Sequence, residues 1–132
     1  MPRFQERLSR LMRVVFHMNS ERQPTDFIAF NLSLELIRSL VPVLGRISKY
    51  DRDLEKQLRK AASSVSLNLA EGRKRTGRDR IHFWRIAAGS AEESRACLHV
   101  ATAWGYLQTQ DIHDPLDVVD QLLAICWRLT HR

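Results

Sequence analysis

The stretch "LEKQLRKAASSVSLNLAEG", Leu54 to Gly72, decides the fold class because its apolar residues recur at helical spacing. They form a stripe made of Leu54, Leu58, Ala61, Val65 and Leu69. Side chains three and four residues apart share one face of an α-helix, so the stripe predicts a helix with one buried face. Asp51 or Asp53 is a suitable N-cap, and Gly72 is expected to close the helix, since glycine tolerates the left-handed C-cap conformation.

A second helix is predicted before this stretch, over residues 27–47, "FIAFNLSLELIRSLVPVLGRI". Apolar residues again recur at three and four, at Phe27, Phe30, Leu34, Ile37 and Val41. Thr25 or Asp26 is the candidate N-cap. Pro42 is expected to kink or loosen the helix near its end, because proline lacks the backbone N–H donor.

Two further helices are predicted after Gly72. The first begins after Thr76 and Gly77, runs to about Trp104, and ends at Gly105. One of its faces carries Ile81, Trp84, Ala88, Ala91, Leu98 and Ala101 or Thr102. The last helix starts around "DIHDPLD", where Pro115 suits a first helical position, and its apolar residues are Val118, Leu122, Ile125 and Leu129.

Four amphipathic helices with short connections predict an all-α fold, an antiparallel up-down four-helix bundle. With 132 residues and 44% hydrophobic content, the chain is long enough for one domain with a single core. The bundle is expected over residues 26–132. Residues 1–25 are expected to form an N-terminal amphipathic extension, for which an extra helix and an Arg-rich transit peptide are the two alternatives.

The cysteines and histidines argue against several classes of site. Cys97 and Cys126 lie inside apolar helical patterns, so no disulfide framework is expected and a reducing cytoplasm is the predicted location. The histidines show no metal-ligand spacing with one another or with the cysteines. Gly72 and Gly77 have the spacing of a phosphate-binding loop, but Arg78 and Asp79 replace its Lys and Ser/Thr. No metal, cofactor or membrane span is predicted.

Positive charge is concentrated where the second and third helices meet. The formal net charge is +6, and residues 52–80 carry nine basic and four acidic side chains. We call the densest part the basic corner, which comprises Arg73, Lys74, Arg75, Arg78 and Arg80. Long cationic side chains on a turn reach phosphates without a base-reading element, which predicts sequence-independent nucleic-acid binding.

Two further features bear on this hypothesis. Arg59 and Lys60 lie about three to four helical turns before the corner and are expected to extend it along one side. The loop contains no aromatic residue, so it offers no platform for stacking bases. The alternative function is a protein-binding scaffold whose basic corner docks an acidic protein partner.

The third predicted helix carries a second apolar row, made of Phe83, Ile86, Ser90 and Cys97. One bundle core does not easily bury two rows. Either the core-facing stripe is wide, or Phe83, Ile86 and Ser90 form an oligomer interface. The small-residue run Ala61 to Ser66 would permit close approach of another helix in both cases.

An ordered set of motifs resembles a known family. The motifs are "QLRKAASSV" at 57–65, "NLAEG" at 68–72, "FWRIAAGSAEE" at 83–93 and "GYL" at 105–107. They are similar to the central part of the bacterial four-helix bundle proteins encoded by intervening sequences in large-subunit ribosomal RNA genes. That family includes the accessory variability determinant of diversity-generating retroelements. The resemblance covers about residues 26–130.

The resemblance implies a homopentameric barrel of four-helix bundles without known enzymatic activity. Its retroelement members bind nucleic acid and partner a reverse transcriptase, so both are expected partners here. The family's "AEG" and "SAEE" patterns fall on Glu71 and Glu92. Glu71 lies at the negative end of its helix, where a cation is needed nearby. A structural polar network of Asn68, Glu71, Arg85 and Glu92 is therefore expected at a helix or subunit junction.

Overall fold

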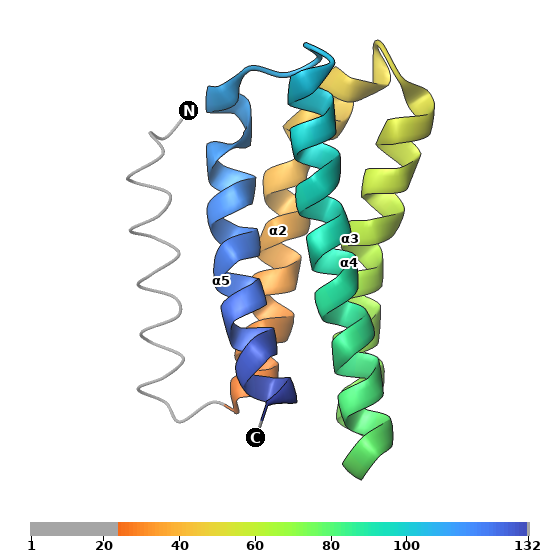
Figure 1. Cartoon of the computed structure of the whole chain (residues 1–132), viewed down its shortest axis with the longest axis vertical. Helices are drawn as coiled ribbons and strands as arrows, with labels where there is room; N and C mark the ends of the chain where they lie inside the picture. The colour runs from red at the N-terminus through yellow and green to blue at the C-terminus, as the bar shows by residue number, and fades with distance from the viewer. Residues whose placement is uncertain (1–23, 132) are drawn as a thin grey trace.

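The computed structural model describes residues 24–131 and consists of four long helices and one short 3₁₀ helix (Figure 1). The elements are α2 (Thr25–Ser48), α3 (Arg52–Lys74), α4 (Gly77–Ala103), η1 (Thr109–Ile112) and α5 (His113–Thr130). Consecutive helices run antiparallel and pack in the order α2, α3, α4, α5, with α5 closing the bundle against α2. The predicted antiparallel four-helix bundle is confirmed, while the predicted extension lies almost wholly outside the described residues.

Three of the four predicted faces form the core. All five residues of the α3 stripe are buried, and most of the predicted faces of α4 and α5 are buried with them. The row predicted on α2 instead lies on its outer side, with Val41 64% exposed and the remainder half-buried. The face of α2 that enters the core carries Ile28, Ala29, Leu32, Leu36, Leu40, Val43 and Ile47.

The connection between α3 and α4 is only two residues long, Arg75 and Thr76. Gly77 opens α4 with φ +57°, a conformation that glycine adopts without the steric cost of a Cβ. The prediction that Gly72 closes α3 is wrong, because the helix continues to Lys74. Gly72 is needed for space: a Cβ there would lie 2.6 Å from Cδ1 and Nε1 of Trp84.

Serine hydroxyls connect neighbouring helices inside the bundle. Ser66 of α3 donates to Ser33 of α2 at 2.7 Å, and the hydroxyls of Ser64 in α3 and Ser90 in α4 are 2.8 Å apart. Small side chains let helix axes approach closely, and these hydrogen bonds satisfy the polar atoms that such packing buries. Part of the second apolar row of α4 is therefore internal, since Ser90 and Cys97 are both buried.

The longest apolar helix is a core helix of the bundle. α2 has the length and mean hydropathy, 1.6, of a membrane span, a test that core helices of soluble proteins also pass. It runs through Pro42, which lies on the exposed side, and buries one face against α3 and α5. Both cysteines are free and buried. Burial raises the pKa of the Cys126 thiol to about 11, which makes its reactive thiolate scarce at neutral pH.

Candidate functional site

The basic corner lies at the end of the bundle where α3 ends and α4 begins (Figure 1). The sequence does not distinguish the five cations of the corner, but in the structure they have different surroundings. Three of them are held by contacts within the chain. The other two have neither a salt bridge nor a hydrogen bond within residues 24–131.

Arg73 and Arg75 are each held by a carboxylate and an aromatic ring. The Nε of Arg73 is 3.1 Å from Oδ2 of Asp26 on α2, and its guanidinium lies 5.3 Å from the centre of the Phe27 ring. Arg75 donates to Glu71 at 2.8 Å and lies 5.2 Å from the centre of the Phe83 ring. The hydrogen bond from Arg75 is the main cause that lowers the pKa of Glu71. These two arginines therefore stabilise the helix ends.

Arg80 caps the end of α3. Its guanidinium donates to the carbonyl oxygens of Gly72 and Arg73, both at 3.1 Å, and lies 5.4 Å from the centre of the Trp84 ring. The last carbonyls of a helix have no intrahelical partner and carry partial negative charge, so a cation there is favourable. Arg80 is held in place by α3 and is not free to turn toward a ligand.

Lys74 and Arg78 are the two corner cations left to solvent. Both are exposed, and neither makes a salt bridge or hydrogen bond to any described residue. The charge of Lys74 acts on Glu71 only as a minor cause of its lowered pKa. Arg85 lies two helical turns further along α4. Like Arg78, it is exposed and makes no salt bridge or hydrogen bond to a described residue.

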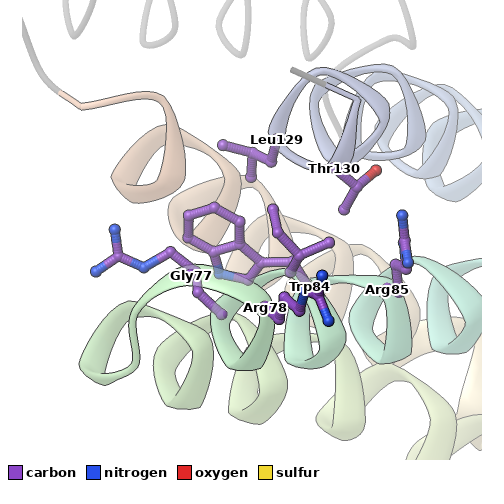
Figure 2. Close-up of a pocket in the computed structure, with 8 residues that line it drawn as sticks. Gly77, Arg78, Trp84, Arg85, Leu129 and Thr130 are labelled. Atoms are coloured by element: carbon purple, nitrogen blue, oxygen red, sulfur yellow. The ribbon is translucent and has the colours of Figure 1, made fainter.

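Arg78 and Arg85 line one pocket together. It has a volume of about 690 Å³ and lies between the start of α4 and the end of α5 (Figure 2). Its lining residues are Gly77, Arg78, Arg80, Ile81, Trp84, Arg85, Leu129 and Thr130. Three of them are arginines and none is acidic. The pocket therefore combines an apolar base with a cationic rim, which suits an anionic group.

The predicted extension of the corner along α3 is partly neutralised. Arg59 forms a salt bridge with Glu55, one turn earlier on the same helix. Lys60 is exposed and has no salt bridge within the described part of the chain. Of this pair, only Lys60 presents an uncompensated charge.

The predicted polar network does not form within one chain. Asn68 donates to the carbonyl and hydroxyl oxygens of Ser64, and Glu71 bonds to Arg75. Arg85 and Glu92 are exposed, and no hydrogen bond or salt bridge joins them to these residues or to each other in the described range. Local partners, one turn away, satisfy Asn68 and Glu71 instead. A network at a subunit junction stays a prediction.

The predicted oligomer interface is divided by the fold. Ser90 is buried and its hydroxyl bonds to Ser64, so it is used inside the chain. Phe83 is half-buried beside Arg75, while Ile86 is exposed. Of the three, Ile86 is the residue most available to another subunit.

Metal binding finds no support in the described region. Within residues 24–131, no three His, Cys, Asp or Glu side chains are grouped closely enough to hold a metal ion.

Comparisons with known proteins agree with this architecture. A crystal structure of a protein of unknown function from the S23 ribosomal protein family of Bacteroides thetaiotaomicron has a TM-score of 0.76 and 17% sequence identity. The match covers 83% of this chain and all of the other, and at that identity it establishes the fold alone. The comparison with curated proteins finds no match. The model of the 23S rRNA-intervening sequence protein family matches residues 25–127, which is most of the bundle. The chain therefore belongs to the 23S rRNA-intervening sequence protein family.

Proposed function

We propose that this protein is a non-enzymatic, oligomeric nucleic-acid-binding protein of the cytoplasm that contacts phosphates through its basic corner. The observation that carries the proposal is a set of exposed cations at one end of the bundle, Lys74, Arg78 and Arg85, which have no salt bridge or hydrogen bond to the described part of the chain. The last two border a pocket without acidic lining residues. Lys74 and Arg78 lie at the α3–α4 turn and Arg85 two turns into α4. Such cations contact phosphates and do not read base edges, so binding is expected to be insensitive to base sequence.

The electrostatics of the corner favour this function further. Arg73, Arg75 and Arg80 are held in place, yet only Arg73 and Arg75 are paired with carboxylates. The corner therefore keeps a net positive potential even after its internal salt bridges are counted. When such cations contact the phosphates of a nucleic acid, they displace the counterions condensed there. The release of these counterions favours binding, and the affinity therefore falls as the salt concentration rises.

The test is a titration of the full chain with labelled RNA and with duplex DNA across a salt series. We expect binding to both, with an association constant that falls linearly on a log–log plot against salt concentration. A protein that binds neither near physiological salt would refute the proposal. The basic corner would then be tested as a docking surface for an acidic protein, the alternative function.

We further propose that the protein assembles as a homopentamer, the state that its resemblance to the retroelement members implies. Exposed apolar residues on the outer side of α3 and α4, among them Leu67 and Ile86, are consistent with an interface there. Gly89, on α4, is exposed, and a Cβ at that position would meet no atom within 4 Å. Glycine inside a helix costs about 0.5–1 kcal/mol relative to alanine, and no contact within residues 24–131 requires glycine at position 89. Close approach of another subunit would explain it.

Replacement of Gly89 with alanine tests this interface. We expect the change to raise the stability of the individual chain by about 0.5–1 kcal/mol and to weaken its self-association. Light scattering gives the mass of the assembly, and thermal unfolding at low protein concentration gives the stability. A wild-type protein that stays monomeric contradicts the oligomer, and an unchanged pentamer in Gly89→Ala removes Gly89 from the interface.

The proposed protein partner is a reverse transcriptase, as in the retroelement members that the sequence resembles. It rests on that resemblance alone. Co-purification of the two proteins from cells that express both would support it.

A further inference from the structure

Three aromatic side chains stack at the end of the bundle opposite the basic corner. The rings of Tyr50 and Tyr106 have centroids 5.3 Å apart and planes within 3° of parallel. Trp104 stacks with Tyr106 at 6.5 Å and 17°. Tyr106 is shared by both contacts, and the three residues come from two separate connections of the bundle. We call this group the aromatic stack.

The backbone and one carboxylate hold the stack in place. Gly105 has φ +83°, which turns the chain sharply between Trp104 and Tyr106 at the end of α4. The hydroxyl of Tyr106 donates to Oδ2 of Asp51 at 3.2 Å. The other oxygen of Asp51 accepts the backbone N–H of Leu54 at 2.9 Å and so caps α3. The central ring is therefore anchored to the start of a core helix.

The outer rings of the stack remain largely in solvent. Tyr50 is 66% exposed and Trp104 is 69% exposed. Exposed aromatic rings that are already aligned and anchored are typical of surfaces that bind a partner. The fold itself gains little from rings in this position, since most of their area stays in water.

Two unpaired cations lie next to the stack in the sequence. Residues 46–53 carry three basic and two acidic side chains. Lys49 precedes Tyr50 and Arg52 follows it by two residues, and neither makes a salt bridge to a described residue. Arg46 is paired with Asp111, and both line a pocket of about 370 Å³ next to the stack. Aromatic rings next to unpaired cations fit a partner that has both flat rings and negative charge.

We propose that the aromatic stack is a base-stacking site for single-stranded nucleic acid. One or two unpaired bases stack on the exposed rings of Tyr50 and Trp104, while Lys49 and Arg52 contact the adjacent phosphates. A duplex buries the faces of its bases, so it does not use this site. The proposal rests on the nucleic-acid binding proposed above and adds a preference for single strands.

The geometry of the bundle relates the two sites. α3 has 23 residues and spans roughly 35 Å, with the aromatic stack at its start and the basic corner at its end. Lys56 and Lys60 are exposed on α3 between them. A single strand that follows α3 reaches both sites, whereas a duplex engages the corner alone.

The test compares Trp104→Ala with the wild-type full chain. The probes are a fluorescein-labelled oligothymidylate and a labelled duplex of the same length, each measured across a salt series. We expect the variant to bind the single strand about five- to a hundred-fold more weakly at every salt concentration, with an unchanged salt slope and unchanged duplex binding. Val41→Ala is the control, because Val41 is similarly exposed, at 64%, but lies on α2 and belongs to neither site.

Thermal unfolding of each variant establishes that it is folded, and Tyr50→Leu provides an independent second change. Unchanged single-strand binding in both variants would overturn the stacking site while leaving the proposed function intact. An equal loss for single strand and duplex, or an equal loss in Val41→Ala, would overturn it as well. A wild-type protein that binds no nucleic acid at all would refute the proposed function first and this site with it, and the stack would then be a protein-docking surface.

Discussion

Replacing Gly72 with alanine is expected to lower the free energy of unfolding by about 1–3 kcal/mol. The new Cβ would lie 2.6 Å from two atoms of the Trp84 ring and 3.2 Å from the carbonyl oxygen of Arg80. Trp84 has little room to move, because it is only 4% exposed and its Nε1 donates to the carbonyl of Leu69 at 3.3 Å. The steric cost therefore exceeds the gain in helix propensity that alanine brings.

Gly45→Ala is the matched control for this change. Gly45 also lies inside a helix, α2, but a Cβ there meets no atom within 4 Å. We expect this variant to be as stable as the wild type or more stable by up to about 1 kcal/mol. Urea or thermal unfolding followed by circular dichroism measures both variants. Equal stability of Gly72→Ala and Gly45→Ala would contradict the tight contact between Gly72 and Trp84.

The largest effect on function is expected from Lys74→Ser combined with Arg78→Ser. Both side chains are exposed and without salt bridges in the described structure, so each is available to a phosphate. Loss of two phosphate contacts should reduce the magnitude of the salt slope by about two. Affinity at low salt should fall by about ten- to a hundred-fold, equivalent to about 1.4–2.8 kcal/mol. Fluorescence anisotropy with labelled RNA across a salt series measures both quantities.

The control removes the same charge elsewhere, with Arg38→Ser and Arg95→Ser. Arg38 pairs with Glu35 on α2, and Arg95 lies 3.5 Å from Asp120. Both arginines are already compensated by carboxylates, so their loss should change the salt slope much less. An equal effect of the two double variants would mean that binding depends on net charge and not on the basic corner.

Helical periodicity was sufficient to predict the fold, because every helix has at least one continuous apolar face. It failed to select the right face only in α2. There the outer row that contains Phe30 and Val41 is as apolar as the row that contains Leu32 and Leu36. Spacing alone does not distinguish two apolar faces of one helix. The packing of α3 and α5 against α2 makes that choice, and it is a tertiary effect.

The sequence predicted where the basic residues cluster, but not which of them form salt bridges and which remain free. Local density identified the basic corner, yet pairing decides which cations are free. Asp26, near the start of α2, is distant in sequence but forms a salt bridge with Arg73 at the end of α3. The carbonyl oxygens at the end of α3 hold Arg80. Arg85 was assigned to a polar network and lines the pocket instead. Its spacing of seven residues from Arg78, two turns along one helix, is the signal by which the sequence could have placed both arginines on one face.

The aromatic stack was not predicted, and the reason is its sequence separation. Tyr106 and its hydrogen-bond partner Asp51 are 55 residues apart, in two different connections between helices. Only the antiparallel packing of the bundle brings those connections to the same end. The basic loop contains no aromatic residue, so it predicted no stacking platform within the loop. The fold nevertheless brings a stacked pair, Trp127 and His131 with centroids 4.5 Å apart, to the same end of the bundle, at the end of α5.

Arginine footprinting with phenylglyoxal, read by mass spectrometry with and without RNA, tests most directly whether the basic corner contacts phosphates. The account predicts that RNA slows modification of Arg78 and Arg85 strongly, while Arg38 on α2 reacts at the same rate in both conditions. Arg80 should react slowly throughout, because its guanidinium is bound to the carbonyls of Gly72 and Arg73. RNA that binds the protein and leaves the modification rates of Arg78 and Arg85 unchanged would contradict the account.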